Sequence, residues 1–403
     1  MAKKDMYFPI DEYHDRWKRV YAEMKKRGYE VAIVWGKSAG TYERSMDILY
    51  LTNFYSTHSG QEPDAPGATG WNARSFCAAI LMNGEPPELH TDLVDPYLER
   101  MPTDRHNFAL DPIKSLADAL NERKIEGPVA WFGSDVLPVK YAMQLWEMTP
   151  KIEYVYDDDL MQQIRKLKSP RELDVYREGG EMVTLAVNET MEALIMGKTE
   201  AEAAALGAAS MIRQGGFFER IPISHGDATS HLERDPTYGF SQDAPKSGDL
   251  IHMAIYGPIH QGYWFDPVRT AVGGRNPSPG QKKLIEDLVR IIQEGIEAHI
   301  RHGAKVHDVA HSVLNLQAEL GYGQTDLNKN WPYFGHGNGC LWEPPFISLE
   351  CATEDEIFEE NMVASSEAFI TGDGVGTAIM ENNFIVHKDG IEHLYSKIPM
   401  IWW

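Results

Sequence analysis

Cysteine is scarce in this sequence: Cys77, Cys340 and Cys351 are the three cysteines among 403 residues. Their number is odd, and no pair has the Cys-x-x-Cys spacing. Both features argue against a disulfide framework and against a cysteine-rich zinc site. A reducing cytoplasm is the simplest setting for a chain with this cysteine content.

Long apolar runs are also missing. The amino-terminal stretch MAKKDMYFPIDEYHDRW is charged and lacks the apolar segment that a signal peptide contains. No other apolar run approaches the length of a membrane span. We therefore expect a cytoplasmic protein without a membrane partner.

Basic residues are in deficit, with 38 Lys and Arg against 60 Asp and Glu and a net charge of −22. This balance argues against nucleic acid or an anionic membrane as a main partner, and it favours cationic substrates. The hydrophobic content of 43% and the charged content of 24% are typical of a globular protein. The length suggests two domains.

The first 160 residues combine helical patterns with short apolar runs. Apolar residues at helical spacing from Tyr13 to Met24, followed by Gly28, predict a helix. The runs at 30–35, 47–54, 75–82 and 128–133 predict strands, with helical patterns between the later ones. We expect residues 1–160 to form an α/β domain.

The character of the chain changes after residue 160. Ser169 can cap a long helix, because Pro170 follows it and Glu172 stands three residues after the cap. Helical patterns also cover 199–214, 280–300 and 306–320, with extended segments between them. We expect residues 161–403 to form an α+β domain.

Isolated polar residues stand in apolar, strand-like segments of this second domain. An acid inside such a segment is costly to bury without a partner, so several of them suggest that they meet. A cluster of carboxylates with histidine indicates a hard or borderline cation, or a site for an organic cation. Taken alone, each residue also has an ordinary structural explanation. The candidates are His231, Asp266, His336, Glu367 and Glu381.

Five segments in this order resemble the pita-bread family of methionine aminopeptidase, aminopeptidase P, prolidase and creatinase. They are IRKLKSPRELDVYREGGEMV, GDLIHMAIYGPIHQGYWFDPVRT, FGHGNG, FEENMVASSEAF and MENNFIVHKDG. The resemblance covers nearly the whole chain. It implies a pita-bread catalytic domain over 161–403, preceded by an α/β domain of the creatinase, prolidase and aminopeptidase P branch.

The resemblance also implies a ligand set for metal. The peptidases of this family hold two ions with two Asp, one His and two Glu. Carried over by position, the ligands that this chain retains are Asp266, His336, Glu367 and Glu381. The first Asp falls on Ile255, with Gly257 matching the glycine of the family's Asp-x-Gly. We therefore expect one divalent ion (Mn, Fe or Zn) or none, and an apolar Ile255 that narrows the site.

Further roles follow from the same resemblance. His231 matches the family's substrate-facing histidine, and a second catalytic histidine of the family falls on Glu343. In creatinase, an arginine of the amino-terminal domain reaches across a dimer to the substrate carboxylate. Arg74 stands at the corresponding place, which implies a homodimer whose amino-terminal domain contributes to the partner's site.

Aromatic residues crowd the segments that carry the acids. Core packing accounts for most of them. Tyr256, Trp264 and Trp342 are candidates for binding substrate, since rings beside carboxylates suit a sulfonium, ammonium or guanidinium group.

Four functions remain open at this point. The leading hypothesis is a creatinase-like hydrolase of a C–N bond in a small zwitterionic or cationic substrate. His231, Glu367 and Glu343 would be its catalytic residues. The second is a lyase similar to the dimethylsulfoniopropionate lyase of this fold, which HGNGCLWEPPF resembles. The others are an Xaa-Pro peptidase and a catalytically silent binding protein.

Overall fold

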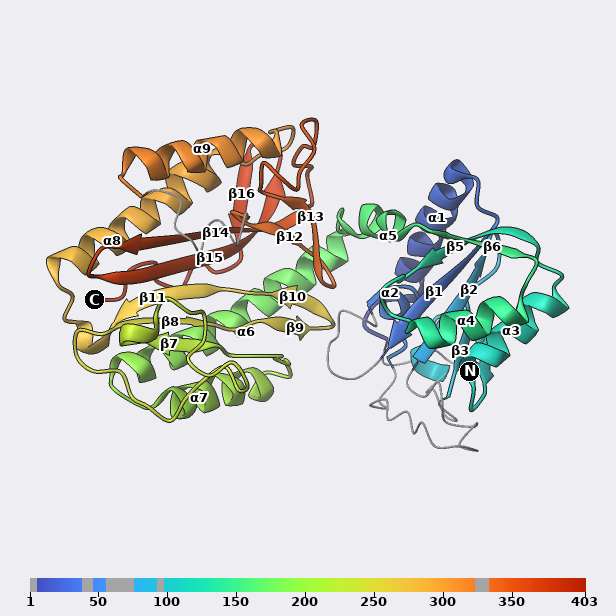
Figure 1. Cartoon of the computed structure of the whole chain (residues 1–403), viewed down its shortest axis with the longest axis horizontal. Coiled ribbons are helices and arrows are strands. Elements are labelled where there is room, and N and C mark those ends of the chain that lie inside the picture. Colours follow the sequence, from blue (N-terminus) through green and yellow to red (C-terminus); the bar gives the residue numbers. More distant parts are fainter. Residues whose placement is uncertain (1–5, 38–45, 56–75, 93–97, 323–332) are drawn as a thin grey trace. The chain divides into compact units, whose positions relative to one another are not determined.

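The computed structural model of the chain is shown in Figure 1. It describes residues 6–37, 46–55, 76–92, 98–322 and 333–403. The chain forms two compact units, Met1–Arg165 and Lys166–Trp403. The domain boundary expected after residue 160 falls inside helix α5 (Asp158–Arg165).

A mixed sheet forms the centre of the first unit. Strand β1 pairs antiparallel with β2 and parallel with β5. Among the described residues, the strand order is β4-β3-β2-β1-β5-β6. The strands are β1 (Val31–Lys37), β2 (Phe76–Met82), β3 (Glu88–Thr91), β4 (His106–Phe108), β5 (Gly127–Phe132) and β6 (Ile152–Tyr156). The strands predicted at 30–35, 75–82 and 128–133 are therefore confirmed as β1, β2 and β5.

The apolar core of this unit lies between the sheet and helices α3 (Pro112–Glu122) and α4 (Val139–Met148). Asp111 begins α3 by accepting a hydrogen bond from the backbone N–H of Lys114. The predicted amino-terminal helix is confirmed as α1 (Ile10–Arg27), which ends at Gly28 in the left-handed conformation. A 3-10 turn, η3, covers Leu98–Arg100.

The strand predicted at 47–54 is wrong. The structure has helix α2 (Met46–Thr52) there, and six of its seven side chains are buried. A short segment that is buried on nearly every side has no polar face, so its sequence lacks the periodicity that distinguishes helix from strand.

Two helices open the second unit. The side chain of Ser169 accepts from the Glu172 backbone, and the side chain of Glu172 accepts from the Ser169 backbone. This capping box confirms the predicted start of α6 (Pro170–Ile195). Helix α7 (Glu200–Arg213) begins with the same kind of box at Thr199.

A large antiparallel sheet follows. Within the described residues its order is β13-β12-β14-β15-β11-β8-β7, with β16 also pairing with β15 and with β9 and β10 forming a separate hairpin. The strands are β7 (Ile223–His225), β8 (Leu250–Ala254), β9 (Gly257–His260), β10 (Tyr263–Phe265), β11 (Val268–Val272), β12 (His336–Asn338), β13 (Trp342–Phe346), β14 (Val363–Gly372), β15 (Gly376–His387) and β16 (Gly390–His393).

Helices cover this sheet from two sides (Figure 1). Helix α6 packs against β8, β9 and β10, whereas α8 packs against β14 and β15. The helix predicted over 280–300 is α8 (Pro279–Arg290), followed by a π-helical turn η6 (Ile291–Ile296) and a 3-10 turn η7 (Glu297–His299). The helix predicted over 306–320 is α9 (Val306–Glu319). Further 3-10 turns cover Gly226–Ala228 (η4) and Gly273–Arg275 (η5). Among the described residues, no helix combines the length and apolar character needed to cross a bilayer.

Alternation along β14 and β15 divides their side chains between two faces. Ala368, Ala378 and Met380 belong to the core shared with α8 and α9. Neighbouring side chains of a strand point in opposite directions, so the odd-numbered residues face away from these helices. We call that side of the sheet the inner face. An apolar cluster lies on it, made of Ala254, Tyr256, Val268, Phe369 and Ile379.

Candidate metal centre

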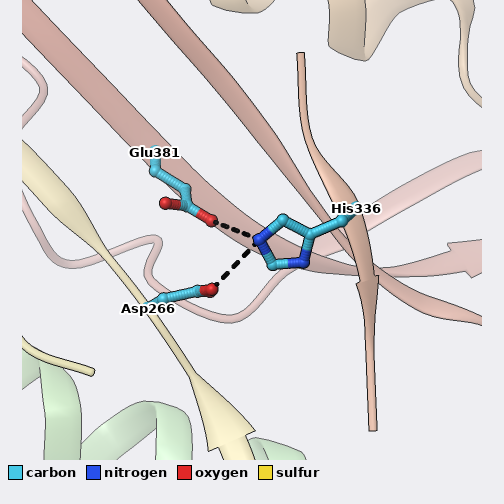
Figure 2. A group of neighbouring side chains, drawn as sticks. All are labelled: Asp266, His336 and Glu381. Atoms are coloured by element: carbon cyan, nitrogen blue, oxygen red, sulfur yellow. Dashed lines mark ion pairs between the residues drawn. The ribbon is translucent and has the colours of Figure 1, made fainter. Parts of the chain in front are cut away.

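Three predicted ligands converge on the inner face. One ring nitrogen of His336, Nε2, lies 3.2 Å from Asp266 Oδ2 and 3.6 Å from Glu381 Oε1 (Figure 2). One donor atom from each residue lies within 4.8 Å of the other two. The exposed fractions are 4% for Asp266, 1% for His336 and 3% for Glu381, so the group is shielded from water.

Strand pairing brings these residues together from distant parts of the chain. Val268 of β11 pairs with Glu381 of β15, which places Asp266, two residues earlier, beside that strand. His336 begins β12, next to β14. The preceding Gly335 has φ 129°, and a Cβ atom there would overlap the Ser365 carbonyl. Only glycine fits this close approach, which sets His336 against β14.

The orientation of the His336 ring suits a metal ligand. Its other nitrogen, Nδ1, lies 3.2 Å from the carbonyl oxygen of Gly337. A carbonyl can only accept, so Nδ1 carries the proton and donates it. In the neutral ring, the lone pair then stands on Nε2, the atom that faces the two carboxylates.

The electrostatics of the group show a shortage of positive charge. Burial works to raise the pKa of Asp266, but the charge and hydrogen bond of His336 outweigh it and lower that pKa. Burial works to lower the pKa of His336, and the charge of Asp266 raises it. Burial and the charges of Asp266 and Glu367 raise the pKa of Glu381 well above its usual value. Burial and the neighbouring carboxylates thus disfavour the charged form of Glu381 when no cation is bound.

Glu367 lies beside this group. It is the cross-strand partner of Glu381, so both side chains lie on the inner face. It is 5% exposed, and its charge raises the pKa values of both His336 and Glu381.

These residues fit a divalent cation. The Oε1 atom of Glu381 is buried without a hydrogen-bond partner, a state that a bound cation relieves. The donor set of carboxylate oxygens and one imidazole nitrogen suits Mn, Fe or Zn.

Aromatic residues predicted to bind substrate lie against the ligands. The indole N–H of Trp264 donates to Asp266 Oδ2 over 3.0 Å. The ring of Trp342 stacks on His336 with 4.4 Å between centroids, and the ring of Tyr256 stacks on Trp264. Trp264 and Trp342 therefore contact predicted ligands, and their own contact with substrate stays a prediction.

The role expected of Ile255 is wrong. Its side chain is fully buried, and its Cδ1 atom lies 3.6 Å from the point where a Cβ atom on Gly207 of α7 would stand. Phe265 pairs with Gly257, two residues after Ile255, and its ring packs on Gly179 of α6, which places this face of the hairpin against the helix. Ile255 thus faces the helices and does not narrow the site.

The residues that do face the site on this strand are Ala254 and Tyr256. Both pack with Val268 and Ile379 on the inner face. Neither Ala254 nor Tyr256 has a carboxylate. Within the described residues, β8 and the two residues after it therefore place no acid opposite Asp266. That the chain lacks one ligand of the family's set stays a prediction.

Two further predicted residues are not part of the group formed by Asp266, His336 and Glu381. His231 is exposed on the loop that follows η4. Burial lowers the pKa of His252 to about 4, against the opposing effect of the His231 backbone. Glu343 is fully buried, and its Oε2 atom lies 3.3 Å from the ammonium nitrogen of Lys168, which is also buried. Catalytic roles for His231 and Glu343 stay predictions. Arg74 lies outside the described residues.

Sequence reasoning missed two asparagines that contact Asp266. The amide nitrogen of Asn383 lies 2.8 Å from Asp266 Oδ1, and that of Asn338 lies 3.4 Å from the same atom. Their nearness to ligands in the segments HGNG and MENN was the available signal.

Comparison with known proteins places these features in a family. The model of metallopeptidase family M24 matches residues 174–388. The chain belongs to metallopeptidase family M24. Membership confirms the expected branch of prolidases, aminopeptidase P and creatinase, and it confirms a hydrolase that acts on C–N bonds.

Relatives within M24 are similar over most of the chain. A protein of Mycobacterium bovis named probable dipeptidase PepE is 28% identical over 268 residues, covering 65% of this chain and 67% of the relative. An Xaa-Pro dipeptidase of Pyrococcus horikoshii is 25% identical over 317 residues, covering 78% and 85%. The crystal structure of a prolidase from Thermococcus sibiricus matches 97% of this chain and 99% of its own, with a TM-score of 0.78 at 20% identity. This likeness confirms the predicted pita-bread architecture with its α/β amino-terminal domain.

Proposed function

We propose that this M24 chain hydrolyses a C–N bond in a small zwitterionic or cationic substrate and uses one divalent ion. Asp266, His336, Glu367 and Glu381 would hold that ion. The observation that carries the proposal is the buried convergence of Asp266, His336 and Glu381, in which one carboxylate oxygen of Glu381 has no hydrogen-bond partner. Mn, Fe and Zn are the candidate ions.

The side chains on the inner face favour one ion over two in this proposal. Two-ion hydrolysis needs carboxylates that bridge both ions and hold the water between them. Ala254 and Tyr256 stand where a second acid would face Asp266, and neither can act as a carboxylate ligand. The retained residues make one four-ligand set, which is enough for a single ion.

The chain's own side chains divide the remaining work. A bound ion would supply an acidified water molecule as nucleophile. Glu367 and Asp266 would orient the substrate or the attacking water, and His231 would give a proton to the leaving nitrogen. The apolar cluster around Val268 and Phe369 would exclude bulk water from the neighbouring part of the inner face.

A dipeptide is one member of this substrate class, because its amino and carboxylate groups make it a small zwitterion. The relatives named dipeptidase and Xaa-Pro dipeptidase favour dipeptides, and Xaa-Pro dipeptides in particular, as a second and narrower candidate. The homodimer and the contact of Arg74 with a substrate carboxylate belong to the same proposal.

The test is hydrolysis by the Mn²⁺-loaded full chain of a panel of Xaa-Pro dipeptides, other dipeptides and guanidino acids. Incorporation of one oxygen from ¹⁸O-labelled water into a product is the expected result. His336→Ala should abolish both metal binding and turnover, and His231→Ala should abolish turnover alone. An alkene product would favour elimination and contradict the proposal, as would undiminished turnover by His336→Ala.

A further inference from the structure

The two carboxylate oxygens of Asp266 have different surroundings. Oδ2 faces Nε2 of His336, at 3.2 Å, and accepts from the indole of Trp264. Oδ1 accepts from the side-chain amides of Asn383 and Asn338. One oxygen therefore points to the place of the ion, and the other is held by neutral protein donors.

The orientation of the Asn383 amide is fixed by groups on its other side. The backbone N–H of Asp266 donates to Asn383 Oδ1 over 3.1 Å, and a backbone N–H can only donate. The hydroxyl of Tyr395 donates to the same oxygen over 2.5 Å. With its oxygen engaged by two donors, Asn383 must turn its NH₂ group toward Asp266 Oδ1.

Both residues are sequestered, so water does not compete for these hydrogen bonds. Asn383 is fully buried and Tyr395 is 3% exposed. Tyr395 follows β16, and the carbonyl of the preceding Leu394 packs closely against Gly180 of α6. The hydroxyl is thus held by a carboxyl-terminal segment that itself packs on the long helix.

We propose that Tyr395 and Asn383 are positioning residues that fix Asp266 as a one-oxygen ligand of a single ion. The proposal rests on the proposed metal-dependent function. The Asn383 amide donates to Oδ1 of Asp266, which is the oxygen that a bridging aspartate would offer to a second ion. It also prevents the Asp266 carboxylate from rotating, so that Oδ2 keeps its direction toward the His336 nitrogen. Outer partners of this kind change metal affinity by about 10- to 100-fold when removed.

The test is titration of the metal-free full chain with Mn²⁺, comparing wild type with Tyr395→Phe. This change removes the hydroxyl and keeps the ring. The Kd for Mn²⁺ should rise about tenfold or more, while the melting temperature of the metal-free protein changes little. Tyr322→Phe is the matched control, because Tyr322 donates its hydroxyl to Asp287, which is not one of the proposed ligands. Its Kd should equal that of wild type.

Asn383→Ala is measured beside these variants and should weaken Mn²⁺ binding at least as much. It keeps the test decisive if Tyr395→Phe fails to fold. Wild-type affinity in a folded Tyr395→Phe or Asn383→Ala protein would overturn the positioning role and leave the proposed function intact. A wild-type chain that binds no Mn²⁺ would overturn both.

Discussion

At the scale of single residues, the face on which a strand side chain lies decides its role. Ala254 and Ile255 are neighbours in the sequence, yet one packs on the inner face and the other against the helices. Identity and spacing alone assign the missing acid to Ile255. The pairing of Ala254 with Val268 instead places Ala254, and not Ile255, on the inner face.

Aspartate at these two positions should have opposite consequences. Ile255→Asp puts a carboxylate against α6 and α7, where it has no partner, and should destabilise the fold by about 3 kcal/mol or more. Ala254→Asp puts it on the inner face, where a cation can compensate it. Thermal unfolding with and without Mn²⁺ measures the difference. Ala254→Asp should gain more from Mn²⁺ than wild type does, and the opposite order would contradict the assignment of faces.

Glu381 should make the metal-free protein sensitive to alkaline pH. Its pKa in the folded state is raised, so its neutral form stabilises the fold at low pH. This stabilisation is lost as the pH rises through the raised folded pKa. In EDTA, wild type should lose roughly 2 °C or more of melting temperature relative to Glu381→Gln as the pH rises from the ordinary carboxyl value of 4.5 into the alkaline range.

The control for this experiment is Glu392→Gln. Hydrogen bonding to Arg177 helps lower the pKa of Glu392 to about 2, so its contribution is lost only in acid. Glu392→Gln should therefore follow wild type at alkaline pH. Parallel curves for wild type and Glu381→Gln would show that Glu381 is ionised in the metal-free fold, and the proposed shortage of positive charge around it would then be wrong.

At the scale of elements, the site depends on how closely α6 approaches the sheet. Gly179 leaves room for the ring of Phe265, and Gly180 for the carbonyl of Leu394. These contacts flank Asp266 and Tyr395 in the sequence. The helix therefore packs against both the hairpin that leads to Asp266 and the segment that carries Tyr395.

Gly179→Ala should weaken metal binding through this packing. Alanine favours a helix over glycine by about 1 kcal/mol, but a methyl group that overlaps Phe265 should cost about 1–3 kcal/mol and displace the residue next to Asp266. Ser169→Ala is the control, since loss of the cap should cost about 1 kcal/mol without moving Phe265. Mn²⁺ titration should show weaker binding in Gly179→Ala alone. Equal affinity in both variants would contradict the link between α6 and the ligand.

At the scale of the whole molecule, the sequence predicts features that depend on the chemistry of particular side chains, such as helix caps and candidate ligands. It does not predict features that depend on which strands pair and in which register. Ser169 and Glu172 reveal a helix start because a cap needs those side chains at that spacing. His336 and Glu381 are recognisable because ligand types stand out in apolar strands. Helix α2 was not predicted because its buried segment has no periodic pattern of polar and apolar residues. Asn383 was not predicted because no sequence motif marks an asparagine that contacts a ligand. The side occupied by Ile255 depends on strand register, which one sequence does not contain.

The number of metal ions per chain tests the single-ion site most directly. The full chain would be loaded with Mn²⁺, freed of excess by gel filtration and measured by elemental analysis, together with His336→Ala and His231→Ala. We predict one ion per chain in wild type and in His231→Ala, and none in His336→Ala. Two ions per wild-type chain, or none, would contradict the single-ion site.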